Sequence, residues 1–368
     1  GGRIMKYAVV GFGTAGYHAV KKIRKLDKEG CIDVYSNTGR APYNPMLTTY
    51  YAFGKLEYEG MFPFGDLEQI QKEVDFNLRR EQVVKVHGSE HLVETEKGSE
   101  KYDRILIATG ARAFAPPVKG LEPEDAFLMR TVEDALRFKD RLKKNDIKHA
   151  VVIGASMAGI KVVEVLHKYG IETWLLDLAS YIFSLAAYKE VAEEIEKRVE
   201  AQGVHLMFGV TIDHMEQENG EKVAVLTDGS RIPADIVGLC IGTRAITETV
   251  QGEVEIGRGI VVDDHMRTSV PGIFAAGDCC EGNNLESGQN QIIGLWANAN
   301  HQGETAGINM AGGDMTYKGN ILHNITHFMN MDFIGFGDNR MQGEILEYGS
   351  LSEDLYIRLV IDGKRIVG

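Results

Sequence analysis

Short apolar runs that end in glycine-rich turns recur along this chain, and each leads into a stretch with helical periodicity. The first is YAVVGFGTAGYHAVKKI, which begins at Tyr7, and a further apolar run, CIDVYS, follows it. The second is HAVVIGASMAGIKVVEVLHKYG, which begins at His149 and is followed by IETWLLD. Each pattern predicts a strand, a turn, a helix and a second strand, which is the unit that builds parallel sheets.

The other segments fill in a mixed pattern. Residues 37–55, NTGRAPYNPMLTTYYAFGK, are predicted to be a loop. Asn219-Gly220 and Asp228-Gly229 separate short alternating runs and predict two hairpins. DRILIATGARA, ADIVGLCIGTRA and PGIFAAGDCC each predict a buried strand that runs into a glycine turn. A helix is expected in GLWANANHQGETAGINMAGG, with strands and turns over 313–368.

Two strand–turn–helix units with a meander after the second predict an α/β fold with two Rossmann-like dinucleotide-binding domains, the second inserted in the first. The first domain is expected over 1–112 and 236–312, and the second over 113–235. Residues 313–368 are expected to form a short C-terminal α+β segment of an incomplete domain.

Composition narrows the possible functions. The 368 residues carry a net charge of −13, which argues against nucleic acid and anionic membranes as partners. No apolar run is long enough to span a bilayer. The four cysteines form no CxxC motif, so a cytoplasmic protein is expected, with Cys279 and Cys280 as small buried residues rather than a redox pair.

The first glycine turn has the spacing that a pyrophosphate requires. Gly11 permits a tight turn, Gly13 lets the backbone approach the phosphates, and Gly16 lets the helix pack closely on the strand. The helix N-terminus then points its N–H groups at the anion. By itself this motif is weak evidence, because glycine turns have other uses.

Four stretches in order make the chain resemble the FAD-dependent pyridine nucleotide oxidoreductases, in particular rubredoxin and ferredoxin reductases and the N-terminal part of nitrite reductase large subunits. They are the Gly11–Gly16 turn, IATGAR, GASMAG and TSVPGIFAAGD. The resemblance covers nearly the whole chain. It implies FAD in the first domain, with Asp278 on the ribityl chain and Trp296 and Ala297 near the isoalloxazine ring.

The resemblance assigns a set of residues to each cofactor. The expected FAD residues are Gly11, Gly13, Thr14, Ala15, Gly16, Ser36, Asn44, Pro45, Val84, Ala108, Thr109, Gly110, Gly277, Asp278, Trp296 and Ala297. The expected NADH residues are Gly154, Ser156, Met157, Gly159, Asp177 and Gly242. NADH is favoured over NADPH because Asp177 suits a free ribose and no arginine follows it for a 2′-phosphate.

The chain departs from the family pattern at several positions. Ser36 stands where a ribose-binding carboxylate is usual, so that hydrogen bond lacks charge assistance. Met46 stands where some relatives carry a redox cysteine, and no cysteine lies between Cys31 and Cys240. Thiol chemistry is therefore not expected at that place. No metal site is expected either.

Two residues are candidates for a catalytic role. Lys161 replaces a glutamate that relatives pair with a loop cation, where this chain has Pro45. Lys161 could stabilise a negative reduced flavin, block the nicotinamide, or simply extend its ammonium into water. Tyr43, with Tyr50 and Tyr51, could shield the flavin or seat a planar substrate, or only pack the loop.

The function implied is an FAD-dependent NAD(P)H oxidoreductase. NADH would give a hydride to FAD, which would pass electrons directly to an electron-carrier protein, to oxygen or to a small organic acceptor. Two alternatives stay open. The chain could be a flavin-binding subunit or sensor of a larger complex, or a flavin reductase of one organic substrate. A homodimer is possible by the same resemblance.

Overall fold

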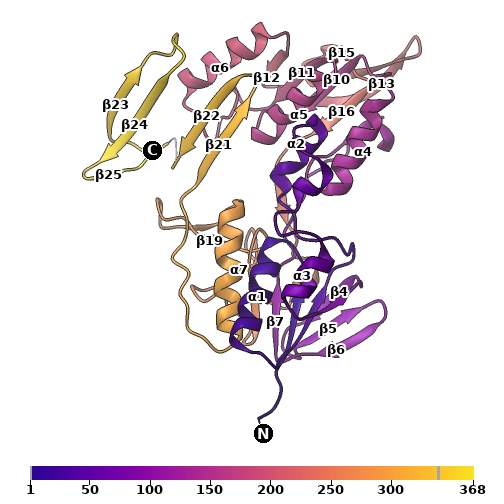
Figure 1. Ribbon diagram of the computed structural model, residues 1–368. Coiled ribbons are helices and arrows are strands. Elements are labelled where there is room, and N and C mark those ends of the chain that lie inside the picture. The colour runs from indigo at the N-terminus through magenta and orange to yellow at the C-terminus, as the bar shows by residue number, and fades with distance from the viewer. Residues whose placement is uncertain (1, 338–339) are drawn as a thin grey trace. The chain divides into compact units, whose positions relative to one another are not determined.

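The computed structural model describes residues 2–337 and 340–368 and contains two compact units (Figure 1). Unit 1 comprises residues 1–44, 59–112 and 244–321, and unit 2 comprises 45–58, 113–243 and 322–368. The division differs from the predicted one. Residues 45–58 and 236–243, expected in the first domain, group with unit 2, and the expected C-terminal segment divides, with 313–321 in unit 1 and 322–368 in unit 2. The α/β class and the two parallel sheets agree with the predicted fold.

Unit 1 is built on a parallel sheet with the strand order β18-β7-β1-β2-β3. These strands are β1 (Lys6–Val10), β2 (Cys31–Tyr35), β3 (Asn77–Arg79), β7 (Arg104–Ile107) and β18 (Ile273–Ala275). The helices of the unit are α1 (Thr14–Leu26), α3 (Leu67–Glu73) and α7 (Trp296–Met310). An antiparallel sheet of β4 (Val83–His87), β5 (Leu92–Thr95) and β6 (Gly98–Lys101), and the short pair β19 (Gly282–Asn283) and β20 (Asn290–Gln291), complete it.

Unit 2 repeats this plan with the strand order β12-β11-β10-β16-β9. Its parallel strands are β9 (Ala126–Phe127), β10 (His149–Ile153), β11 (Glu172–Asp177), β12 (His205–Phe208) and β16 (Ile236–Leu239). Its helices are α2 (Thr48–Phe53), α4 (Val132–Lys143), α5 (Met157–Lys168) and α6 (Lys189–Ala201). An antiparallel sheet of β13 (Ile212–Glu218), β14 (Glu221–Leu226) and β15 (Arg231–Pro233) contains both predicted hairpins.

The described residues of the C-terminal segment of unit 2 form strands and turns and no helix, so the α part of the predicted α+β segment is absent from them. The segment contains the hairpin of β21 (His323–Phe328) and β22 (Met331–Phe336), and a sheet of β23 (Glu344–Gly349), β24 (Tyr356–Asp362) and β25 (Arg365–Ile366). The short strands β8 (Ala111–Ala113) and β17 (Thr243–Ala245) pair where the chain passes between the units. None of the helices in 2–337 and 340–368 combines the length and apolar content needed to cross a membrane.

Alternate residues of the central strands enter two separate apolar cores, which is why these strands read as continuous apolar runs. In β1, Tyr7 and Val9 face the core shared with α1, while Ala8 and Val10 face the core shared with β4 and β5. In β10, Val152 packs on the α5 side, and Val151 packs on the side of β13–β15.

One local prediction was wrong. Residues 37–55 are not a loop throughout, because Thr48–Phe53 form α2 after a 3₁₀ turn at Pro45–Leu47. The Thr48 hydroxyl donates to the Pro45 carbonyl at 2.7 Å, and Gly54 ends the helix in a left-handed conformation. Apart from Ala52, the residues of the helix, Thr-Thr-Tyr-Tyr-Ala-Phe, have weak helix propensity, so the pattern alone does not show it.

Candidate functional site

The register of the unit 1 sheet brings the predicted FAD residues to one edge. Val10 pairs with Tyr35 and with Ile107, and Ile107 pairs with Ala275, so four strands end in one row. The residues that follow them form the carboxyl edge, where open α/β sheets bind ligands. All predicted FAD residues except Pro45 belong to this unit, and so does Tyr43.

The first glycine turn is packed tightly on its inside. Gly11 has a φ of +102°, and a Cβ there would lie 2.1 Å from the carbonyl oxygen of Ala108. A Cβ on Gly16 would lie 2.3 Å from the carbonyl oxygen of Gly11. Gly13 differs, because a Cβ there would meet no atom within 4 Å. The turn is therefore fixed by backbone contacts but open at Gly13, the glycine predicted to face a pyrophosphate.

The helix that follows leaves its N-terminus open to an anion. Gly13 is the N-cap of α1, no side chain caps that end, and its first turn holds no acid. Its free N–H groups and helix dipole favour a negatively charged group there. The Thr14 hydroxyl donates to Asn300 of α7, which ties the start of α1 to α7.

Gln302 holds the second glycine turn of unit 1, and sequence reasoning missed it. Gln302 of α7 is fully buried, and its Oε1 accepts a hydrogen bond from the Gly277 amide at 2.9 Å. Its Nε2 donates to the carbonyl of Glu281 at 3.2 Å. The turn that carries Asp278 is thus fixed from both sides. The helix carries several other polar residues, so nothing in the sequence distinguished Gln302.

Apart from Pro45, the other predicted FAD residues lie in unit 1, most of them in segments that flank its glycine turns, whereas Val84 is on the antiparallel sheet of β4–β6. The Ser36 amide donates to Arg79 at 2.9 Å, and the Thr109 hydroxyl donates to Ile246 at 2.6 Å. Ala15, Asn44, Ala108, Gly110, Asp278 and Ala297 lie in the segments that flank these turns, and Val84 of β4 exposes 53% of its surface. Trp296 begins α7, and among the described residues its buried indole N–H has no partner. An orphaned donor and an open glycine both fit a bound flavin nucleotide.

Unit 2 has the matching edge. Ile153 pairs with Leu176 and Leu239, so Gly154 and Asp177 follow neighbouring strands. Gly154 has a φ of +110° and would place a Cβ 2.1 Å from the Cys240 carbonyl. A Cβ on Gly159 would lie 1.8 Å from the carbonyl of Gly154. Met157 begins α5, and Gly242 follows β16 with a φ of +93°.

Two side chains define this second edge. Asp177 accepts the Ala155 amide at 2.7 Å and the Ala179 amide at 2.8 Å, so its carboxylate is held beside the glycine turn. Ser156 stands at the position of a middle glycine and caps α5, its Oγ accepting the Gly159 amide at 3.2 Å. The turn thus resembles that of unit 1, with a hydroxyl in place of the open glycine.

Lys161 does not extend into water, so that alternative was wrong. The residue is 9% exposed and lies on α5. Its ammonium donates to the His327 carbonyl of β21 and lies 4.7 Å from the ring centroid of Tyr50, with the Tyr50 hydroxyl at 3.4 Å. Lys161 therefore links α5 to α2 and to the C-terminal hairpin within unit 2.

Tyr43 and Pro45 lie just before α2 in the sequence. Tyr43 is half-buried, with its ring edge-to-face against Phe62 at 6.0 Å. Pro45 begins the 3₁₀ turn before α2. Met46 exposes 58% of its surface and carries no nucleophile, so this segment offers no thiol.

Cys279 and Cys280 are buried, as predicted. Both thiols donate to backbone carbonyls, Cys279 to Ile107 and Cys280 to Gly277. Its hydrogen bond to Cys279, and then burial, raises the pKa of Cys280 well above its ordinary value. The Cys280 thiol is therefore held protonated, which fits a small core residue.

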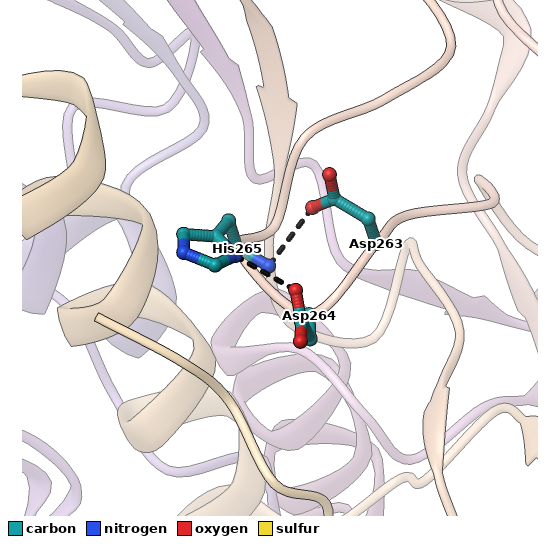
Figure 2. Close-up of side chains that lie close together, drawn as sticks. All are labelled: Asp263, Asp264 and His265. Carbon is teal, nitrogen blue, oxygen red and sulfur yellow. Dashed lines mark hydrogen bonds and ion pairs between the residues drawn. The ribbon is translucent and has the colours of Figure 1, made fainter. Parts of the chain in front are cut away.

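One cluster has metal-ligand residue types, and Figure 2 shows it: Asp263, Asp264 and His265. Both ring nitrogens of His265 are engaged by carboxylates, Nδ1 by Asp264 at 2.7 Å and Nε2 by Asp314 at 2.5 Å. These hydrogen bonds raise the pKa of His265. With both ring nitrogens hydrogen-bonded to carboxylates, these residues form a hydrogen-bonded cluster in the structure. His323 and His327 lie on the strand β21.

The sequence matches the family model described as pyridine nucleotide-disulphide oxidoreductase over residues 5–303. The chain is 28% identical to subunit epsilon of the NADH-dependent phenylglyoxylate dehydrogenase of Aromatoleum evansii, with 93% of this chain and 82% of the relative covered. It is also 28% identical to the ferredoxin–NAD(+) reductase component of a 3-phenylpropionate/cinnamic acid dioxygenase of Photorhabdus laumondii, covering 84% and 78%. The solved NAD-dependent persulfide reductase of A. fulgidus superimposes with a TM-score of 0.89 at 25% identity, covering 99% and 73%.

Proposed function

This chain belongs to the pyridine nucleotide-disulphide oxidoreductase family, and we propose that its two glycine-turn edges hold FAD and NADH. We further propose that the flavin passes electrons directly to a carrier protein, with no redox cysteine of this chain in between. The observation that carries the proposal is the pair of matching edges, each at the carboxyl end of its own parallel sheet. FAD, when bound, supplies the hydride and electron chemistry, and the protein supplies binding and electrostatics.

Unit 1 would hold FAD through the open turn at Gly13 and the N-terminus of α1, which suit its pyrophosphate. Ser36 would take the adenosine ribose without charge assistance. The uncapped N-terminus of α7, which starts at Trp296 with no acid in its first turn, would favour negative charge on the ring system. This helix supplies electrostatic stabilisation that does not depend on Lys161.

Replacing Asp177 by alanine is expected to raise the KM for NADH about 10- to 100-fold, since a charge-assisted hydrogen bond is worth roughly 1.5–3 kcal/mol. The carboxylate would accept the ribose hydroxyls while its two backbone N–H contacts hold it in place. Steady-state kinetics with NADH and NADPH provide the measurement. An unchanged KM for NADH in the folded variant would remove Asp177 from the site.

A carrier protein is favoured as the electron partner for a chemical reason. No cysteine lies between Cys31 and Cys240, and Met46 occupies the position of the redox thiol, so a disulfide is a poor acceptor here. The relative from Photorhabdus laumondii is a ferredoxin–NAD(+) reductase component by name. A second candidate is a subunit of a larger complex, favoured by the relative that is itself a dehydrogenase subunit.

The test is anaerobic mixing of the purified holoprotein with NADH while the visible flavin band is followed. Rapid bleaching is expected, followed by recovery of the band when an oxidised [2Fe–2S] ferredoxin or a rubredoxin is added. Bleaching without recovery by either carrier would contradict the carrier assignment. A yellow protein that neither NADH nor NADPH bleaches would favour a flavin-binding subunit or sensor.

A further inference from the structure

Four lysines gather around the C-terminal end of α2 in unit 2. They are Lys55 just after α2, Lys139 and Lys143 on α4, and Lys168 at the end of α5. Lys55, Lys143 and Lys168 are exposed, and Lys139 is half-buried. These four residues are called the lysine patch below. Segments far apart in the sequence thus present one kind of charge at one place.

The patch is seated on two aromatic rings. The Lys139 ammonium lies 4.2 Å from the ring centroid of Tyr51. The ammonium groups of Lys55 and Lys168 lie 4.5 Å and 4.4 Å from that of Phe53. Lys139 also donates to the Tyr51 carbonyl at 3.1 Å, and Lys168 donates to that of Phe53. Lys55, Lys139 and Lys168 are therefore held at fixed positions.

The patch carries more cations than its neighbours neutralise. Lys55 pairs with Glu164 at 3.2 Å, but no carboxylate among the residues that the structure describes lies within ion-pair distance of Lys139, Lys143 or Lys168. Burial lowers the pKa of Lys139, and the positive charges of Lys143 and Lys168 lower it further, against an opposing effect of Glu57. Capping of the C-terminus of α2 accounts for Lys139 and Lys168, but it does not account for Lys55 and Lys143.

The chain as a whole has a net charge of −13, so it repels other acidic proteins over most of its surface. We propose that the lysine patch is the docking surface for an acidic protein, namely the electron carrier of the proposed function. The inference rests on that function. Three of the four cations lie over two half-buried rings, Tyr51 and Phe53, which adds aromatic contacts of the kind that protein interfaces use.

The experiment measures NADH-driven reduction of a purified acidic [2Fe–2S] ferredoxin under anaerobic conditions by the holoprotein and its variants. Lys143→Glu is the main variant, because Lys143 is exposed and has no ring or carbonyl contact from its side chain among residues 2–337 and 340–368. The double variant Lys143→Glu/Lys168→Gln extends the test. Lys197→Glu on α6 is the matched control, since Lys197 is also exposed and the charge change is identical.

Lys143→Glu is expected to raise the KM for ferredoxin about fivefold at low ionic strength, and the double variant about tenfold, with kcat and bleaching by NADH unchanged. The difference should largely vanish near 0.5 M salt, where the Debye length falls to roughly 4 Å. Lys197→Glu should match the unmodified protein.

Equal KM values for Lys143→Glu, the double variant and Lys197→Glu would overturn the docking surface while leaving the proposed function standing. If the unmodified protein is bleached by NADH but reduces neither this ferredoxin nor a rubredoxin, the proposed function fails and the inference fails with it. A KM effect that persists in high salt would indicate a conformational change and would also overturn the electrostatic docking.

Discussion

Gly13→Ala is expected to give a folded protein that loses most of its flavin during gel filtration. Gly13 has a φ of −83° and a ψ of −162°, which alanine adopts readily, and its added methyl would meet no protein atom within 4 Å. The substitution is therefore expected to leave the fold and its stability unchanged. The methyl would instead occupy the space through which the pyrophosphate approaches the α1 N-terminus, weakening FAD binding about 10- to 100-fold.

The ratio of flavin to protein absorbance, together with far-UV circular dichroism, measures this. Gly11→Ala is the matched control and should behave differently. Its methyl would fall 2.1 Å from the Ala108 carbonyl at a φ of +102°, so the unit itself should lose roughly 3 kcal/mol or more. A Gly13→Ala protein that keeps its full flavin content would place the pyrophosphate elsewhere.

The parallel sheets and their glycine turns were predictable because the required signal is local. A buried strand, a positive-φ glycine and an amphipathic helix lie within about thirty residues of one another, as in the βαβ unit. Gly11 and Gly154 show this directly, since both occupy conformations that exclude other residues. Family membership then confirms the expected oxidoreductase class.

Helix α2 was not predictable, because its stability comes from distant residues. Six residues are too few for a helix that is stable alone. Its last carbonyls are capped by Lys139 and Lys168, which follow it by roughly a hundred residues in the sequence. Such a helix depends on contacts from α4 and α5 for its stability, and no pattern within residues 48–53 records that.

The packing of α7 on α1 could not be predicted from the sequence either. A Cβ on Gly303 would lie 2.3 Å from the Ala15 carbonyl, and one on Gly307 would lie 2.5 Å from the Ala19 carbonyl. The two helices therefore lie side by side at close range, as Figure 1 shows. Two glycines four residues apart are visible in the sequence, but the surface they face is known only from the fold.

The second large prediction concerns Lys161, which helps to hold the C-terminal hairpin of unit 2 from α5. Its ammonium donates to the carbonyl of His327, and Glu164, one turn later, accepts the Met329 amide at 2.7 Å. These two contacts flank Phe328, which is completely buried. Met329 has a φ of 48°, so the hairpin turn is strained and depends on these polar contacts.

Lys161→Met is expected to destabilise unit 2 by about 2 kcal/mol, because it removes a charged hydrogen bond and leaves the carbonyl without its donor. Lys161→Glu, which carries the residue that relatives use, should cost more, about 4 kcal/mol, since a buried carboxylate would then face a carbonyl oxygen. Urea unfolding midpoints and hydrogen exchange of the β21 amides (His323–Phe328) measure both.

The kinetics of flavin bleaching by NADH separate this structural role from the catalytic one. A residue that acts by holding the hairpin should give Lys161→Met a lower unfolding midpoint and faster exchange in β21, with a bleaching rate close to that of the unmodified protein below its unfolding range. A residue that stabilises charge on the reduced ring should do the opposite: an unchanged midpoint with a bleaching rate at least about tenfold lower. Because the ammonium is already committed to the His327 carbonyl and the Tyr50 ring, the first pattern is expected.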